Sequence, residues 1–580
     1  MTARADSHRV LLRAQPENCW LCFERPVAVI ETFSLDEVQD ALLKIQDQIR
    51  LKGVYAAGFI SYEAGPAFDD SYQTVTDDVF PKLWFGLFQS LRKLEALPDP
   101  GIRPGRPVWV PELKFPEYQN RIKVIKKHIE QGDTYQVNYT YRLRTRLEQD
   151  PFCFFTCLAQ SHDPPFAAFV DTGQYSVCSF SPELFFKLTG DILESRPMKG
   201  TLARRPAFWP DQSQALMLRS CDKNRAENVM ITDMVRNDLG RIADPGSVEV
   251  KDLFQAEKYP TLWQMTSRVS CRTRARLGSV MGALFPPSSI TGAPKPSTMK
   301  IIAGLEVSPR RIYTGCIGYA GPGRRAQFNV AIRTVLVDNR TRQAEYGVGG
   351  GIVWDSTPED EWNECKTKSR ALHRISPEFS LLESILWTGK GGYHLLGAHM
   401  ARLKESGVYF DFCVDMKKVL SSLREFGKNL GARDWKVRLL VDKTGRIRIQ
   451  KQVVEDLPSP FLLSLAAGGI SSDDPFLYHK TTSRRAFDDA GSSNPKAHST
   501  LFWNERGEIT EASMANIALE IGGILWTPPV RSGLLAGTYR QFLLASGVLQ
   551  EKVLYLEDMQ KCSGVFLINS VRGMFRAKLT

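Results

Sequence analysis

A break near Ser376-Pro377 limits what this chain can fold into, because it divides the sequence into two unequal parts. Before the break, the run from Glu359 to His373 has the pattern of a helix that closes a unit. After it, a new series of strand and turn signals begins at Phe379. The 580 residues also exceed one ordinary core, since a domain takes about 150 residues. The sequence therefore predicts at least two units, and its length permits two activities.

Composition and charge argue against several classes of protein. The contents of 43% hydrophobic and 24% charged residues are typical of a soluble chain, and no apolar run approaches the roughly 18 residues of a membrane span. The first residues do not resemble a secretory signal, so we expect a cytoplasmic protein without a membrane partner. The eleven scattered cysteines favour reduced thiols over a disulfide framework. The net charge of +11 is interleaved with acids; a small anionic substrate explains it as well as nucleic acid does, and we expect no nucleic-acid partner.

Lys199 lies in a turn-like segment between Pro197 and Gly200, where a lysine can act as a nucleophile. Alone, this segment is weak evidence, because a lysine beside a glycine is usually an exposed charge on a loop. Its weight depends on the segments around it.

The run 223–239 has helical periodicity. The apolar residues on one face are Met230, Ile231, Met234 and Val235. Glu227 falls on the same face, where a carboxylate must be paired, protonated or bound to a cation. A buried salt bridge with an arginine and a metal site are equally good interpretations of this pattern.

Glu364 and Lys368 are i and i+4 neighbours, a spacing that on its own usually indicates a surface ion pair. Just upstream, the glycines of the segment Gly347–Gly351 could bring bare backbone N–H groups against an anion. This segment lacks the spacing of a dinucleotide fingerprint, so we do not expect NAD.

Seven short motifs of the first unit occur in the order of a known family. They are Gly132–Asn138, Ser181-Pro182-Glu183, Pro197–Thr201, Arg225–Asn228, Ser289–Lys295, Ala331–Thr334 and Gly349–Ile352. Through them, most of residues 115–375 resembles the chorismate-utilising enzymes. The resemblance implies an α+β fold in which two antiparallel sheets pack as a sandwich with helices outside. Residues 1–114 would form the N-terminal part of this domain.

The residue at position 199 distinguishes branches of this family. Anthranilate synthases have alanine there, whereas aminodeoxychorismate synthases have lysine, as this chain does. Isochorismate and salicylate synthases activate water with a lysine where this chain has Gln136. A histidine linked to pyruvate loss in anthranilate synthases is also missing from the segment Trp263–Ser267. The resemblance thus points to 4-amino-4-deoxychorismate formation, with anthranilate formation as the alternative.

The resemblance also implies roles in a reaction at the C4 hydroxyl of chorismate. Lys199, with a pKa lowered by burial, would attack C2 as the hydroxyl leaves C4, and ammonia would then add at C4 and expel the lysine. Glu183 would be the general acid and base, and Glu227 and Glu364 would hold Mg²⁺. The residues expected to fix the substrate are Tyr313, Arg333, Gly350, Gly351 and Lys368.

The ammonia needs a source. This sequence shows no glutaminase unit with a nucleophilic cysteine in a Gly-rich turn. We therefore expect a separate glutamine amidotransferase subunit as a partner, with free ammonia as the alternative.

Four motifs characterise residues 376–580. They are His399–Leu403, Tyr478–Arg484, Ile509–Ile517 and, after Thr527-Pro528-Pro529, Gly533–Arg540. Gly522-Gly523 also predicts a tight hairpin between two apolar strands. This segment resembles the fold-type IV pyridoxal phosphate (PLP) enzymes, which include branched-chain aminotransferases and aminodeoxychorismate lyase. The resemblance implies an α/β domain and permits a homodimer through it.

In this resemblance, Lys480 would hold PLP covalently and move a proton, and Glu511 would keep the pyridine nitrogen protonated. Arg402 would bind the phosphate, and Thr538 and Ser570 would add contacts to it. The early active-site threonine of the family has no counterpart that we can assign within Phe379–Trp387.

Fold alone does not separate a lyase from an aminotransferase. The fusion favours the lyase, which would release pyruvate from the product of the first unit and give 4-aminobenzoate for folate synthesis. An aminotransferase of branched-chain or D-amino acids is the alternative. A degenerate scaffold is a third possibility, against which stand Lys199, Glu227, Glu364, Lys480 and Glu511.

Overall fold

The computed structural model describes residues 8–99, 101, 105, 107–373, 378–492, 494 and 496–580. The chain forms two compact units, one of Met1–Ala203 and Ala215–Ser376 and the other of Arg204–Gln214 and Pro377–Thr580. The predicted break at Ser376-Pro377 lies outside the described residues. Nothing in the sequence pattern predicted that Arg204–Gln214 belongs with the second unit.

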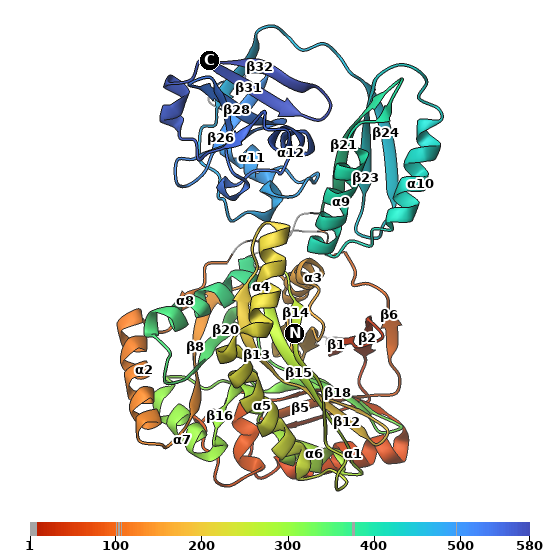
Figure 1. Ribbon diagram of the computed structural model, residues 1–580. Helices are drawn as coiled ribbons and strands as arrows, with labels where there is room; N and C mark the ends of the chain where they lie inside the picture. Colours follow the sequence, from red (N-terminus) through yellow and green to blue (C-terminus); the bar gives the residue numbers. More distant parts are fainter. Residues whose placement is uncertain are drawn as a thin grey trace. The chain divides into compact units, whose positions relative to one another are not determined.

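Two antiparallel sheets form the framework of the first unit (Figure 1). The first has the order β16 (Gly292–Ala293), β8 (Gln136–Arg146), β20 (Gln343–Ile352), β19 (Thr334–Asp338), β10 (Tyr175–Ser179), β9 (Ala168–Asp171), β1 (Arg9–Ala14), β2 (Cys19–Glu24) and β6 (Arg92–Leu94), with β7 (Val110–Pro111) paired to β8. The second has the order β13 (Met198–Ala203), β15 (Leu262–Arg272), β12 (Ile192–Arg196), β11 (Leu184–Thr189), β18 (Arg325–Val330), β17 (Cys316–Gly321), β4 (Tyr55–Ile60), β5 (Leu83–Phe88) and β3 (Ala28–Thr32), with β14 (Glu249–Lys258) paired to β15.

Apolar side chains of both sheets meet in one core. Val10 and Leu12 of β1 pack in the same cluster as Phe59 of β4 and Trp84 of β5. Because side chains alternate along a strand, the opposite faces remain for helices to cover. Against the first sheet pack α2 (Phe115–Glu130), α3 (Pro151–His162), α7 (Lys295–Leu305) and α8 (Pro358–Ser369). Against the second sheet pack α1 (Val38–Lys52), α5 (Asp222–Gly240) and α6 (Leu277–Leu284). This arrangement confirms the predicted α+β sandwich.

Helix α5 confirms the predicted periodicity, but its buried stripe is rotated from the predicted face. Met230 and Met234 are only partly buried, whereas Asn228 and Thr232 are buried with Ile231. The cause is Asn228, whose side-chain amide donates to the carbonyls of Lys199 and Met265. These polar contacts turn the helix so that Glu227 lies at the edge of its buried face and is half-buried.

The second unit contains a small sheet and a closed one. The small sheet has the order β22 (Gly392–Tyr393), β21 (Leu381–Thr388), β23 (Trp435–Val441) and β24 (Ile447–Val453), with α9 (Leu396–Phe410) and α10 (Met416–Gly427) packed against it. The larger sheet has the order β27 (Ile509–Ala512), β26 (Ser499–Trp503), β25 (Phe461–Leu465), β32 (Gly573–Leu579), β31 (Gly564–Asn569), β28 (Ala515–Ile521), β29 (Ile524–Thr527) and β30 (Gln550–Glu551). Strand β27 also pairs with β28, so this sheet closes on itself. The remaining helices are α11 (Arg485–Ala490) and α12 (Thr538–Ala545) in this unit and α4 (Phe208–Ser220), which spans residues of both units.

The predicted hairpin at Gly522-Gly523 is confirmed. Strands β28 and β29 pair on either side of it, and Ile521 is opposite Ile524. Gly522 and Gly523 have φ of 61° and 78°, which glycine adopts without the steric cost that other residues meet. The turn therefore needs both glycines.

The segment Arg204–Gln214 packs within the second unit. The Arg204 guanidinium lies 4.0 Å from the ring centroid of Tyr409 and pairs with the buried Asp211 at 2.7 Å. Ala207 packs against the apolar cluster that contains Leu477 and Tyr478, two residues just before Lys480. These residues of the first half of the sequence thus complete a core of the second unit.

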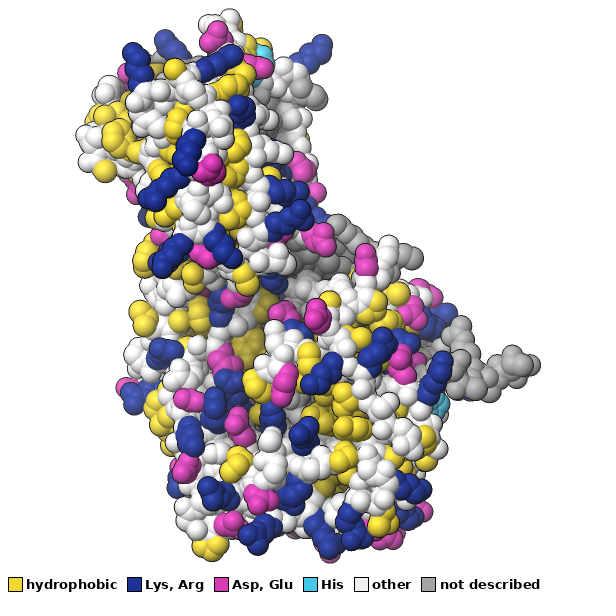
Figure 2. Space-filling view, turned by 90° about the vertical axis from the view of Figure 1, so that its right-hand side faces the viewer, with side chains coloured by type: hydrophobic (Ala, Val, Ile, Leu, Met, Phe, Trp, Pro, Cys, Tyr) yellow, Lys and Arg dark blue, Asp and Glu magenta, His cyan; other side chains and the backbone are white. Residues whose placement is uncertain are grey.

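Charge and hydropathy of the folded chain agree with the sequence pattern. On the face shown in Figure 2, Lys and Arg side chains are interspersed with Asp and Glu. Among the described residues, no helix combines the length and the apolar character that crossing a membrane requires. The structure pairs none of the eleven cysteines, all of which it describes, in a disulfide.

Candidate active sites

The first unit contains a cavity of about 320 Å³. Its walls come from both sheets, from α5 and α8, and from the helical turn Ser288–Ile290. The predicted site residues on its walls are Glu183, Lys199, Glu227, Tyr313, Arg333, Gly351, Glu364 and Lys368. Gly350 is not among them, although a Cβ there would be 2.4 Å from a carboxylate oxygen of the cavity-lining Glu361. The structure therefore brings together residues that the sequence separates by more than a hundred positions.

Lys199 reaches this cavity from a bulge in β13. The pairing of β13 with β15 shifts between Met198 and Thr201, and Gly200 has φ of 91°. Such a bulge inserts an extra residue and redirects a side chain, and the positive φ favours glycine. Desolvation in the cavity lowers the pKa of Lys199, and the positive charge of Lys368 acts in the same direction, although Glu227 opposes both. A lowered pKa gives more neutral amine, which is the nucleophilic form.

Glu183 lies at the start of β11 and is buried. The Ser289 hydroxyl donates a hydrogen bond of 2.7 Å to its Oε1. Burial raises the pKa of Glu183 to about 7, against the opposing effects of the Ser289 hydrogen bond and the charge of Lys199. A carboxyl with this pKa can both give and take a proton near neutral pH.

Acidic groups occupy the wall formed by α5 and α8. Lys368 Nζ lies 2.7 Å from Glu364 Oε1 and donates to the carbonyl of Gly349. The charge of Lys368 lowers the pKa of Glu364. Glu361, which we did not predict, accepts a hydrogen bond of 2.7 Å from Ser356, and burial raises its pKa. Glu227 completes this wall from α5.

This wall has the donor atoms that Mg²⁺ prefers. Within the part of the chain that the structure describes, no three His, Cys, Asp or Glu side chains gather as a ready metal site. Mg²⁺, however, is usually held by one or two carboxylates together with substrate oxygens and water. Glu227 and Glu364 supply oxygen donors on one wall of the cavity and therefore fit such an ion.

Tyr313 and Arg333 provide a polar region elsewhere on the cavity wall. The Tyr313 ring lies against Gly347 so closely that a Cβ there would be 2.2 Å from the ring. Arg333 has φ of 50°, an uncommon conformation for a residue other than glycine. Its guanidinium lies 5.9 Å from the ring centroid of Tyr259, and burial lowers its pKa. A cation and a phenol in one cavity are suited to a carboxylate ligand.

The second unit contains its own cavity, of about 280 Å³. All the predicted cofactor residues are on its walls: Arg402, Lys480, Glu511, Thr538 and Ser570. Burial lowers the pKa of Lys480 to about 8, and the charge of Arg402 acts in the same direction. Glu511 accepts hydrogen bonds from the backbone N–H of Leu535 and the side chain of Asn516, both at 3.2 Å, and burial raises its pKa to about 8.

Arg402 has a buried partner that we did not predict. Glu383 of β21 accepts from Arg402 at 2.9 and 2.6 Å and contacts His399 Nδ1 at 2.7 Å. Burial opposes ionisation of Glu383, but the charge of Arg402 and the hydrogen bonds of His399 and Arg402 hold its pKa at about 2. Arg402 also donates to the carbonyl of Ala536. Three of the five N–H donors of this guanidinium are thus used, which leaves two for an anionic ligand.

Hydroxyl groups surround the same cavity. Thr538 begins α12, with its Oγ1 3.4 Å from His399 Nε2, and the Ser570 hydroxyl donates to the carbonyl of Ser384. Ser384 and Leu382 are the residues of β21 that line the cavity. Where the sequence offered no threonine, Ser384 is thus the hydroxyl that β21 contributes. The amine of Lys480, the carboxyl of Glu511 and these donors fit a phosphorylated pyridine aldehyde such as PLP.

Two family profiles match the chain, and each matches the part that contains one of the two cavities. The profile described as chorismate binding enzyme matches residues 7–374. The chain belongs to the chorismate-binding enzyme family. A second profile, described as amino-transferase class IV, matches residues 380–579.

Individual members of the chorismate-binding family support this assignment. Aminodeoxychorismate synthase component 1 of Salmonella typhimurium is 37% identical over 270 residues, which cover 46% of this chain and 59% of that protein. Anthranilate synthase component 1 1 of Haloarcula marismortui is 35% identical over 279 residues, which cover 48% and 57%. The chain spans between about a third and three fifths of the length of the curated relatives that it matches.

A solved structure of this family has the same fold. Anthranilate synthase component I from Streptococcus pneumoniae aligns with a TM-score of 0.54 and 23% sequence identity, over 62% of this chain and 93% of that one. This likeness supports the α+β sandwich of the first unit.

Proposed function

We propose that the first unit converts chorismate and ammonia into 4-amino-4-deoxychorismate and water, and that the second unit converts this product into 4-aminobenzoate and pyruvate. One observation carries the proposal for the first unit. Lys199, with its lowered pKa, faces the same cavity as Glu183, whose pKa is about 7, and the carboxylates of α5 and α8. A nucleophile, an acid and a cation-binding wall are the groups that displacement of a poor leaving group requires.

The chain's own residues account for the bonds that change. The amine of Lys199 forms a bond to C2 of chorismate, both ring double bonds shift, and the C4 hydroxyl leaves as water with a proton from Glu183. Ammonia then adds at C4, both double bonds return to their original positions, and the bond between C2 and Lys199 breaks. Glu183 recovers its proton in this second displacement. Mg²⁺ at Glu227 and Glu364 would neutralise the ring carboxylate of the substrate.

In the second cavity, Lys480 takes the proton from C4 of the amine, and the enolpyruvyl group leaves C3 as pyruvate. PLP, when bound, supplies the electron sink for this proton loss. Burial raises the pKa of Glu511 to about 8, and its protonated carboxyl would offer a proton to the pyridine nitrogen. The two remaining donors of Arg402, with Thr538 and Ser570, would hold the phosphate. The aromatic product favours the elimination.

Incubation with chorismate, ammonia, Mg²⁺ and PLP, followed by product identification, tests both halves. We expect 4-aminobenzoate and pyruvate in equal amounts. Anthranilate as the product would refute the branch assignment, and accumulation of 4-amino-4-deoxychorismate would refute the lyase.

An aminotransferase is the second candidate for residues 380–579, because the matching profile carries that description. Adding 2-oxoglutarate to the same mixture separates the candidates. Amino transfer without release of pyruvate would favour the aminotransferase.

We also propose that a glutamine amidotransferase subunit supplies the ammonia. The relative from Salmonella typhimurium is named component 1, a name that implies a second component. Glutamine-dependent turnover should rise when such a subunit is added. Equal turnover with and without the subunit would refute this partner.

A further inference from the structure

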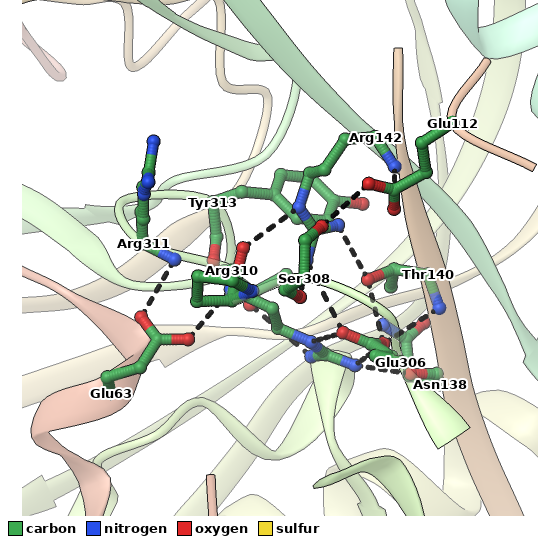
Figure 3. Close-up of polar contacts among 12 residues, drawn as sticks. Glu63, Glu112, Asn138, Thr140, Arg142, Glu306, Ser308, Arg310, Arg311 and Tyr313 are labelled. Carbon is green, nitrogen blue, oxygen red and sulfur yellow. Dashed lines mark hydrogen bonds and ion pairs between the residues drawn. The ribbon is translucent and has the colours of Figure 1, made fainter. Parts of the chain in front are cut away.

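Figure 3 shows a buried polar cluster that includes Asn138 and Tyr313, two residues that line the first cavity. At its centre, the Arg310 guanidinium donates to both carboxylate oxygens of Glu306, at 3.0 and 2.7 Å. The two side chains are 1% and 2% exposed, and neither is on the wall of the cavity. The backbone N–H of Arg310 donates to Glu63, which anchors the same loop from the opposite side.

The other donors of Arg310 fix parts of the cavity wall. Its Nη1 donates to the carbonyl of Ile290 at 2.9 Å, and its Nη2 donates to the carbonyl of Asn138 at 2.6 Å. Ile290 ends the turn Ser288–Ile290, Asn138 is on β8, and Tyr313 follows three residues after Arg310. Ile290, Asn138 and Tyr313 all line the cavity. One rigid, planar guanidinium therefore holds two wall segments that are far apart in the sequence against the loop that carries Tyr313.

One of these segments carries the hydroxyl that contacts Glu183. Ser289 precedes Ile290 directly, and its side chain donates to Glu183 at 2.7 Å. A shift of the Ile290 carbonyl would move Ser289 with it. The position of Arg310 is thus linked to the environment of the proposed general acid.

Stability alone does not account for this arrangement. Replacing a buried ion pair by apolar residues of similar volume is often neutral or stabilising, because two charges lose their hydration on burial. Holding the backbone at fixed points is a different benefit, which a forked donor provides and an apolar side chain does not.

We propose that Arg310 is a positioning residue, which sets the spacing of β8, the turn Ser288–Ile290 and Tyr313 and thereby places Ser289 against Glu183. The inference rests on the amination proposed for the first cavity. It adds a residue that does not touch the substrate but determines the geometry of those that do.

The test compares three variants of the full chain. Arg310→Lys retains the charge but loses the planar fork of donors, and Arg310→Gln removes the charge while Glu306 keeps its ion pair with Arg142. Arg311→Gln is the matched control, because Arg311 pairs with Asp77 and Glu345 instead of the cavity wall. For each variant, thermal unfolding gives the folded fraction, and kcat and KM for chorismate with ammonia are measured from pH 5 to 9.

We expect Arg310→Lys and Arg310→Gln to lose about 10- to 100-fold in kcat/KM per folded molecule, the cost of an error of about 1 Å in a catalytic site. The limb of the pH profile that belongs to Glu183 should also move to higher pH, because the Ser289 hydrogen bond opposes the rise in pKa caused by burial. Arg311→Gln should keep the wild-type profile. Activity that falls only with the folded fraction, at an unchanged pH profile and KM, would overturn the inference. Absence of amination in the wild-type protein would instead refute the proposed function and this inference with it.

Discussion

The contact between Gly351 and Lys199 predicts the effect of a single added methyl group. A Cβ on Gly351 would lie 2.7 Å from Lys199 Nζ and 2.8 Å from Gln136 Nε2. Ordinary van der Waals contact begins at 3.4 Å, so in Gly351→Ala the lysine amine must retreat by about 0.7 Å. Both contacting atoms are the ends of flexible side chains, and the fold can absorb this movement at a cost of about 1 kcal/mol. The amine, however, would no longer be where the wild-type site holds it.

We expect the rate of amination to fall by about 10- to 100-fold, since a misplacement of about 1 Å costs this much. In free energy this is about 1.4 to 2.7 kcal/mol of transition-state stabilisation. The assay is formation of 4-amino-4-deoxychorismate from chorismate and ammonia, with thermal unfolding measured on the same samples. Gly304→Ala is the control, because a Cβ there meets nothing within 4 Å.

Two results would refute this reasoning. Full activity of Gly351→Ala would show that the amine of Lys199 does not need its position beside Gly351. A large drop in melting temperature, with activity lost in the same proportion, would show that the methyl group damages the fold instead of the site.

Other variants test the remaining groups. Lys199→Met should reduce amination by about 10³-fold or more, whereas conversion of supplied 4-amino-4-deoxychorismate should continue; equal loss of both steps would contradict separate sites. Burial raises the pKa of Glu183 from an ordinary value of 4.5 to about 7, so the folded protein binds more protons than the unfolded chain in this window, and stability falls as pH rises through it. Glu183→Gln should flatten that fall in melting curves recorded from pH 4.5 to 7, and an unchanged slope would argue against the raised pKa. Lys480→Ala should lose the absorbance band of covalently held PLP and all 4-aminobenzoate formation; a retained band would assign the attachment to another residue. Glu383→Gln should lower stability by about 3 to 5 kcal/mol, because Arg402 loses its buried counter-charge, and an unchanged melting temperature would exclude this role.

Local physics explains which parts of the fold were predictable. Gly522-Gly523 specifies its hairpin because both residues adopt positive φ, and the run 223–239 specifies a helix through its own periodicity. The orientation of that helix was less predictable. It depends on hydrogen bonds from Asn228 to the distant carbonyls of Lys199 and Met265, which no local pattern encodes.

Two missed carboxylates illustrate what sequence patterns conceal. Glu361 lies among acids in the first turn of α8, where acidic residues are usual because they complement the helix dipole. Its role on the cavity wall cannot be distinguished from that pattern. Glu383 did leave a signal, since it occupies a buried position between Leu381 and Ile385 on an alternating strand. Its partner, Arg402, comes from α9 and is evident only in the folded chain.

The glycines of β20 show a similar limit. The run Gly347–Gly351 predicted close approach of a backbone to an anion. In the structure, these glycines make room for the side chains of Tyr313, Glu361 and Lys199, each at a different glycine. The residue type indicated close approach, and which side chains approach depends on how the two sheets pack. The approach of a bound anion to this backbone stays a prediction.

The place of Arg204–Gln214 has a consequence for dividing this protein. These eleven residues belong to the second unit although more than 160 positions separate them from the rest of it. No single cut of the chain therefore yields two intact halves. A gene split at the break near residue 376 would give a C-terminal fragment without the Arg204–Asp211 ion pair. It would also lack Ala207, which packs against Leu477 and Tyr478 just before Lys480. Separating the two proposed activities would therefore require a version of this segment, which lies between the strand of Lys199 and the helix of Glu227, to be supplied to the C-terminal part.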